Sequence, residues 1–208
     1  IYSMDIIKAL FGKDKPKYFK RCGPRRIAMI GPPGSGKQTI LEFLAKNIEG
    51  AELSQYLAEP CVRTLTDGHV VFYSWDWEEE DTNDQVYSAF DAIIFVARCT
   101  PEFIDEDSKV FSRILSLADI LETPMLVLAN KADLKERLSI AMACDMYKLH
   151  SQRRRQWYIQ NTSGITGDGI LDGMEWLRNV LNHLVRSRLD VDLVFPVRRF
   201  KTAKSARK

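Results

Sequence analysis

Along most of the chain, short continuous runs of apolar residues alternate with longer segments in which apolar residues recur at helical spacing. The runs are typical of strands buried on both faces of a sheet and occupy Arg26–Ile30, Ala92–Ala97, Met125–Ala129 and Trp157–Asn161. The helical patterns occupy residues 38–47, 104–121, 137–149 and 171–188. This alternation predicts an α/β fold, a mostly parallel sheet with helices on both faces, whose ligand loops follow the carboxyl ends of the strands.

Two further patterns add elements that are not part of this alternation. Cys61–Thr66 and His69–Trp75 flank Asp67-Gly68, a dipeptide that suits a tight turn, so they predict an antiparallel hairpin. Near the start of the chain, residues 2–11 place apolar side chains on one helical stripe and charged ones opposite, which predicts an amphipathic helix. The stripe consists of Tyr2, Ile6, Ile7, Leu10 and Phe11.

The patterns divide the chain into three parts. We expect an amphipathic helix and linker over residues 1–25, one α/β domain over 26–190 and a basic tail over 191–208. The 208 residues are 45% hydrophobic and 28% charged, which excludes a disordered, collagen-like or coiled-coil chain. The four cysteines are scattered and form no metal-binding pattern, which favours a reducing compartment.

Charge is distributed unevenly, although the formal net charge is only +2. Residues 1–26 hold eight Lys/Arg against two Asp, and residues 197–208 hold six Lys/Arg and no acidic residue, so the body between them is acidic. Two basic ends on an acidic body indicate contact with phosphate, an anionic membrane surface or an acidic protein partner, with solvated tails as the alternative. We expect no nucleic-acid partner.

A glycine-rich loop follows the first predicted strand and precedes a helix. In this position consecutive backbone N–H groups and the helix N-terminus can surround a phosphate, and the lysine can reach the β- and γ-phosphates. Gln38 stands where a Ser or Thr normally binds magnesium, and Thr39 is next to it. The residues predicted to hold phosphate are Gly31, Gly34, Ser35, Gly36, Lys37, Gln38 and Thr39.

Two later loops carry the pattern that recognises guanine. Asn130-Lys131-Ala132-Asp133 follows the strand Met125–Ala129, and the Asp133 carboxylate can accept hydrogen bonds from N1–H and the exocyclic amine of guanine. Lys131 can lay its stem along the ring, and the backbone of Ser163 and Gly164 can donate to guanine O6. Adenine offers no such pair of donors, so the pattern predicts selectivity for GTP or GDP.

The chain resembles the ADP-ribosylation factor (Arf) family of small GTPases. The resemblance rests on Trp75-Asp76, on residues 128–134 around the N-K-x-D motif, and above all on residues 149–160 and 166–177. It covers roughly residues 1 to 185 and implies a P-loop fold with a six-stranded sheet, about five helices and bound guanine nucleotide. It also implies Asp76 as a magnesium-associated acid, so the candidate metal residues are Gln38, Thr39 and Asp76.

Both switch regions depart from the family pattern. The family follows Trp-Asp with x-Gly-Gly-Gln, whose Gln orients the attacking water, whereas this chain has Trp77-Glu78-Glu79-Glu80. The family's Pro-Thr, whose Thr binds magnesium, reads Pro60-Cys61 here. These degenerate switches predict impaired hydrolysis, because carboxylates would repel the γ-phosphate and no amide orients the water. They also leave it open whether Mg²⁺ is a cofactor.

Three functions remain as hypotheses. The favoured one is a pseudo-GTPase that holds GTP or GDP and acts as a binding or structural subunit of a larger protein complex, with no catalytic residue assigned. The alternative is an active Arf-like switch at membranes. A minor alternative, a nucleoside monophosphate kinase-like enzyme, rests on the glycine-rich loop alone. We expect an intracellular protein, cytoplasmic or membrane-associated, or a complex subunit in an organelle such as the mitochondrion. The chain shows no myristoylation pattern at its start, so we expect the first helix to act without a lipid.

Overall fold

The computed structural model describes residues 25–48, 51–56, 62–66, 70–77, 90–116 and 122–194. The predicted amphipathic helix over 2–11, the Asp67-Gly68 turn, Pro60-Cys61, Glu78–Glu80 and most of the basic tail lie outside these residues. Among the described residues, no helix combines the length and apolarity needed to cross a membrane.

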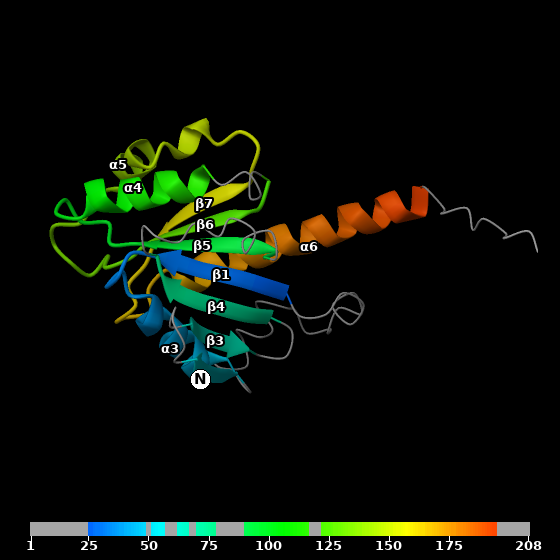
Figure 1. Ribbon diagram of the computed structural model, residues 1–208, viewed down its shortest axis with the longest axis horizontal. Helices are drawn as coiled ribbons and strands as arrows, with labels where there is room; N and C mark the ends of the chain where they lie inside the picture. Colours follow the sequence, from blue (N-terminus) through cyan, green and yellow to red (C-terminus); the bar gives the residue numbers. More distant parts are fainter. Residues whose placement is uncertain are drawn as a thin grey trace, which may run out of the picture.

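Seven strands form one sheet in the order β2-β3-β4-β1-β5-β6-β7 (Figure 1). Five of them run parallel, and they are β1 (Arg25–Gly31), β4 (Val70–Asp76), β5 (Ala92–Ala97), β6 (Met125–Ala129) and β7 (Trp157–Asn161). β2 (Glu52–Tyr56) and β3 (Val62–Thr66) join antiparallel at one edge. The predicted mostly parallel α/β sheet and the antiparallel pairing of β3 with β4 are therefore confirmed.

The sheet has one strand more than the six expected. The additional strand is β2, a polar edge strand in which Leu53 is 42% exposed, so it lacks the continuous apolar run that identified the inner strands. By contrast, every residue of β5 and β6 is buried.

Four α-helices and a short 3₁₀ helix occur in the described part of the chain. They are α3 (Lys37–Asn47), α4 (Ile104–Leu115), α5 (Ile140–Met146), the 3₁₀ helix η3 (Leu149–Ser151) and α6 (Ile170–Val194). α5 begins later than the pattern predicted because the Ser139 hydroxyl accepts a hydrogen bond from the Met142 amide and caps the helix there. α6 continues past the expected domain boundary at residue 190, and its last turns extend beyond the sheet (Figure 1).

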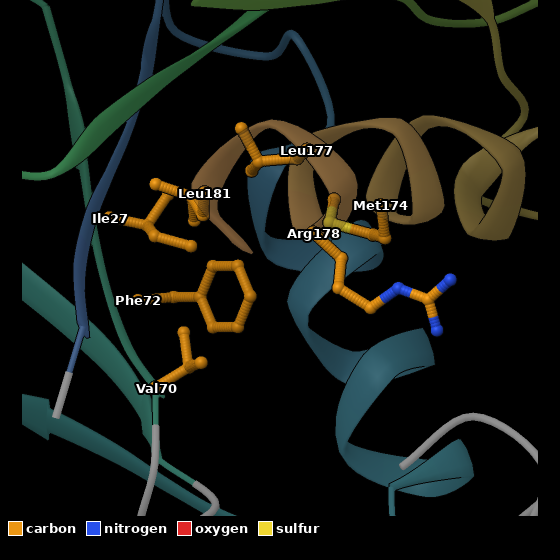
Figure 2. Close-up of a pocket in the computed structure, with 7 residues that line it drawn as sticks. All are labelled: Ile27, Val70, Phe72, Met174, Leu177, Arg178 and Leu181. Carbon is orange, nitrogen blue, oxygen red and sulfur yellow. The ribbon is translucent and has the colours of Figure 1, made fainter. Parts of the chain in front are cut away.

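One face of the sheet is covered by α3 and α6. Leu41 and Leu44 of α3 and Met174 and Leu177 of α6 are buried against the even-numbered apolar residues of β5 and β6. Beside them, near the start of β1 and β4, six apolar side chains and one arginine line a small hollow under α6 (Figure 2). Its lining consists of Ile27, Val70, Phe72, Met174, Leu177, Arg178 and Leu181.

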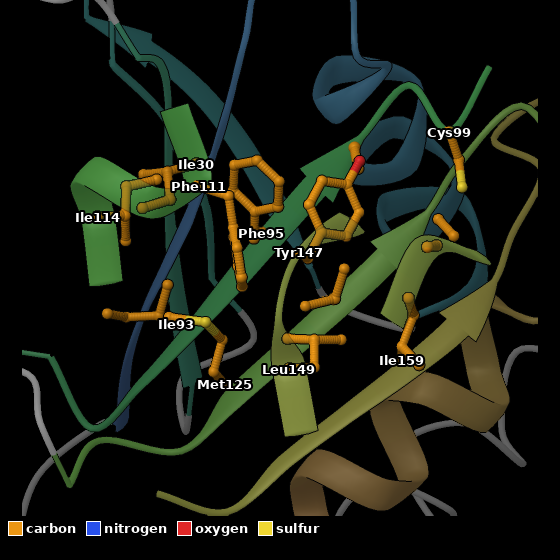
Figure 3. Close-up of a cluster of buried hydrophobic side chains, with 14 of the residues drawn as sticks. Ile30, Ile93, Phe95, Cys99, Phe111, Ile114, Met125, Tyr147, Leu149 and Ile159 are labelled. Carbon is orange, nitrogen blue, oxygen red and sulfur yellow. The ribbon is translucent and has the colours of Figure 1, made fainter. Parts of the chain in front are cut away.

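The other face carries α4, α5 and an aromatic cluster. Phe95, Phe111 and Tyr147 meet with ring centroids 4.8 to 6.1 Å apart, which ties the middle of the sheet to both helices (Figure 3). Packing on both faces fixes the carboxyl ends of β1, β5 and β6 next to one another, and the loops that follow these ends form the candidate site.

Candidate functional site

The glycine-rich loop connects β1 to α3 in the form that a phosphate requires. Gly34 and Gly36 have φ angles of +70° and +95°, which glycine adopts without strain. Among the described residues, the amides of Gly34, Gly36 and Lys37 have no protein acceptor and so remain available to phosphate oxygens. A methyl group at Gly31 would lie 2.2 Å from the Val96 carbonyl oxygen of the neighbouring strand β5. Only glycine therefore fits at the start of the loop.

The ammonium group of Lys37 lies under this loop. It donates to the carbonyl oxygens of Gly31 and Pro32, both at 2.8 Å, and to the Ser35 hydroxyl at 3.0 Å. Asp76, the last residue of β4, adds a carboxylate oxygen at 2.7 Å. Burial lowers the pKa of Lys37 from its ordinary value, and the hydrogen bond that its ammonium donates to Asp76 acts in the opposite direction.

Asn130 connects the phosphate loop to both guanine loops. Its Nδ2 donates to the Ser35 carbonyl at 2.7 Å, and its Oδ1 accepts from the Gly164 amide at 3.0 Å and from the Thr162 hydroxyl at 3.4 Å. The side chain is almost completely buried. One carboxamide therefore sets the distance between the segment that holds phosphate and the segments that hold the base.

The expected base contacts lie at the mouth of the same site. Asp133 is exposed, and one of its carboxylate oxygens accepts from the Ser163 hydroxyl at 2.7 Å, which leaves the other oxygen for a ligand. Lys131 has a φ angle of +66°, and its ammonium lies 5.9 Å from the centre of the Phe103 ring at the start of α4. Acceptor and cation therefore flank the position predicted for guanine.

A family comparison agrees with this geometry. The family model described as the ADP-ribosylation factor family matches residues 11–181. The chain belongs to the ADP-ribosylation factor family. It is thus a GTP-binding Arf-like protein with the small-GTPase P-loop fold.

The candidate metal residues each contact a different partner, Asp76 the Lys37 ammonium and the other two the groups named next. Gln38 is exposed on α3, where its side-chain amide donates to Glu42 at 2.7 Å. Thr39 lies against the base loop, because a methyl group at Gly164 would be 3.2 Å from its Cβ. The described residues contain no cluster of three His, Cys, Asp or Glu side chains that could hold a metal ion. At the position of Gln38 this chain therefore offers an amide in place of the hydroxyl that ordinarily binds Mg²⁺.

The third loop differs in detail from the expectation. The Ser163 amide donates to the Asp168 carbonyl at 3.1 Å, and the Gly164 amide is engaged by Asn130. Within residues 162–167, the Ile165 amide is the one that has no protein acceptor in the described structure. Sequence spacing could not identify the Ile165 amide, because the amides that remain for a ligand are those that do not already donate to another group of the protein.

Sequence reasoning also missed a buried ion pair beside the site. At the end of β5 the guanidinium of Arg98 donates to Asp107 at 2.6 and 2.9 Å, and the Arg98 amide donates to the same carboxylate at 2.6 Å. Arg98 also lies 4.1 Å from the centre of the Phe103 ring. The pair fixes the first turn of α4 against β5, and the interval of nine residues between the two gave no signal of it.

Proposed function

We propose that this Arf-family chain holds a guanine nucleotide without turning it over, and that the nucleotide serves to stabilise the fold of a binding or structural subunit. The observation that carries the proposal is the position of Gln38. Its side-chain amide donates to Glu42 one turn further along α3, so the residue that stands where the family anchors its metal is engaged by a carboxylate of its own helix. A ligand that binds only the folded state still stabilises it by mass action.

The segment after β4 supports the same conclusion. Trp77 is 3% exposed and packs in the cluster beneath α4, so its side chain points into the core and away from the phosphates. Its amide donates to the Gly31 carbonyl at 2.9 Å, which ties this segment to the start of the phosphate loop. The three residues that follow are glutamates, and no glutamine is present there to orient water.

The role in an assembly rests on the ends of the chain. The apolar stripe of residues 2–11 is short and would bury little apolar area in a membrane, and the basic residues at 198–208 are numerous. We therefore favour a protein partner with an acidic surface over a membrane. The alternative of an active switch is favoured by one observation, the presence of Asp76 beside Lys37 at the end of β4.

The test is the nucleotide content and turnover of the purified chain. Denaturation followed by chromatography should release GDP or GTP in near-stoichiometric amount. Single-turnover hydrolysis of GTP should be slower than roughly 10⁻⁴ per second, the slow intrinsic rate of small GTPases. Glu80→Gln alone should not restore it. Turnover within minutes would support the active switch, and an empty site that takes up no guanine nucleotide would refute both.

The partner is tested separately by size. Retention of the full chain in a large complex through size-exclusion chromatography at high salt supports the subunit role. Flotation of the isolated chain with anionic liposomes, lost on deletion of residues 1–12 and steeply reduced by salt, would support the membrane role instead.

A further inference from the structure

Arg155 is a buried cation without an acidic partner in the described part of the chain. The residue precedes β7 and is 5% exposed. Its Nε and Nη2 atoms are buried without a hydrogen-bond partner, and its Nη1 meets the thioether sulfur of Met125, a weak acceptor, at 3.9 Å. Among the described residues, no ion pair includes Arg155. The guanidinium therefore carries N–H groups that bond to nothing in this chain.

Such a cation is costly for the fold to keep. Burial lowers the pKa of Arg155 from its ordinary value, but arginine stays protonated at any pH at which proteins fold, so the charge persists. A buried charge without an opposite charge destabilises a protein, whereas a well-packed apolar side chain of similar volume does not. The packing of this chain alone gives no reason for an arginine here, and an anion from a binding partner would supply one.

The turn that carries this arginine is held in place through its backbone. Residues 152–156, the arginine turn, connect η3 to β7. At one end the Gln152 amide donates to the Leu149 carbonyl at 2.9 Å, and at the other end the Gln156 carbonyl accepts from the Met125 amide at 2.9 Å. A partner that binds the turn therefore meets a backbone that is already ordered, which lowers the entropic cost of binding.

Exposed residues around the turn have the composition of a protein interface. Arg153 and Arg154 are exposed, and residues 146–167 hold four Lys/Arg and no acidic residue, although the body of the chain is acidic. α5 packs against η3 and β7, and its Met142 and Met146, which are 54% and 41% exposed, lie one turn apart on one face. Arginine and methionine are both enriched where proteins bind one another.

The arginine turn lies at the end of the sheet away from the nucleotide loops. Met125 and Trp157 pair at the amino ends of the parallel strands β6 and β7, whereas the loops of Asn130 and Ser163 follow the carboxyl ends. Figure 3 shows Met125 at the end of the buried cluster away from Cys99, which follows β5 on the nucleotide side. A partner bound at the arginine turn therefore leaves the nucleotide loops free.

We propose that the arginine turn binds an acidic segment of a protein partner, and that a carboxylate of this segment pairs with Arg155. A carboxylate matches a guanidinium through two parallel hydrogen bonds, and the flexible side chain of Met125 is easily displaced to admit it. A nucleic acid fits less well, because its phosphates are followed by a row of exposed cations, whereas the unpaired cation here is buried. The inference rests on the proposed role as a subunit and places the partner on the folded domain.

Stability gives the first test, measured on the full chain in urea with the same GDP concentration for every variant. Arg155→Met removes the charge and roughly keeps the length of the side chain, so its unfolding midpoint should equal or exceed that of the unmutated chain. Arg154→Met is the matched control, because it removes the same charge from an exposed position of the same turn and should leave the midpoint unchanged. A lower midpoint for Arg155→Met alone would reveal an internal partner and overturn the inference.

Binding gives the second test, with acetylated hexaglutamate amide as the probe and the backbone amide signal of Gln156 as the local reporter. In the ¹⁵N-labelled full chain this signal, and the Nε–Hε signal of Arg155, should shift on titration with hexaglutamate and not with hexaglutamine. Arg155→Met should weaken the binding roughly tenfold, the loss of one charge-assisted pair, whereas Arg154→Met should weaken it about twofold. The affinity should be the same with GDP and with GTP bound.

The remaining outcomes each decide against the inference or separate it from the proposed function. The absence of a shift with hexaglutamate would overturn it, and so would equal losses for Arg154→Met and Arg155→Met, which would indicate diffuse attraction. Equal or tighter binding of a uridylate decamer at the same reporter would assign the turn to nucleic acid or to any polyanion, and would overturn it as well. A chain that binds no guanine nucleotide but shows the expected shifts and losses would refute the proposed hold on nucleotide and leave the arginine turn as a protein-binding surface.

Discussion

The contact between Gly36 and Asn130 gives the sharpest test of how the site is built. A methyl group at Gly36 would lie 2.2 Å from Asn130 Nδ2, whereas a methyl group at Gly34 would meet nothing within 4 Å. Both glycines have positive φ angles, so alanine at either position is strained by roughly 1 to 2 kcal/mol. Gly34→Ala is therefore a control that carries the strain without the collision.

The additional cost of Gly36→Ala follows from the bonds of Asn130. The carboxamide must retreat from 2.2 Å to an ordinary contact of at least 3.4 Å, and it then loses its 2.7 Å bond to the Ser35 carbonyl and disturbs the bond from the Gly164 amide. Each buried group left without a partner costs about 1 to 3 kcal/mol. We expect Gly36→Ala to lower the free energy of unfolding by about 2 to 4 kcal/mol more than Gly34→Ala does, by the same principle.

Equilibrium unfolding in urea measures this difference, provided that bound nucleotide is removed first, because nucleotide adds its own stabilisation. In a background of Asn130→Ala the collision disappears, so Gly36→Ala should then cost no more than Gly34→Ala. Losses that agree within about 0.5 kcal/mol, the usual margin for independent sites, for Gly34→Ala and Gly36→Ala in the unmutated background would refute the reasoning.

Three further predictions concern single side chains. Asp133→Asn should weaken guanine nucleotide binding by on the order of 2 to 4 kcal/mol and relax selectivity toward xanthine nucleotides, and equal affinity of the unmutated chain for ATP and GTP would contradict the role of Asp133. Asp107→Ala should destabilise the fold by about 3 to 5 kcal/mol because it strands the buried Arg98, whereas Asp105→Ala on the exposed side of the same helical turn should cost little; similar unfolding midpoints would count against a structural ion pair. Burial raises the pKa of the Cys99 thiol to about 11, so little thiolate forms at pH 8 and alkylation followed by mass spectrometry should leave Cys99 unmodified until denaturant is added; rapid labelling of the native chain would contradict its burial.

The inner strands and the nucleotide loops were predictable because their signals are local. β5 and β6 are continuous apolar runs, and the motifs at Lys37 and Asp133 follow strands directly. β2 was not predictable, because a polar edge strand owes its conformation to pairing with β3. The orientation of Gln38 and the pairing of Arg98 with Asp107 depend on tertiary packing, so no pattern of residue types could supply them.

The bonds of Asn130 make the two halves of the nucleotide site a single preassembled receptor. Because one buried carboxamide holds Ser35 on one side and Gly164 on the other, neither loop can rearrange alone. A ligand that carries both a base and a phosphate group thus meets both loops at a fixed separation. Once one end of the ligand is bound, binding of the other end requires no further ordering of the protein. The intact nucleotide therefore binds as a bivalent ligand. Once its base is bound, the effective concentration of its phosphates at the phosphate loop depends on the spacing that Asn130 fixes.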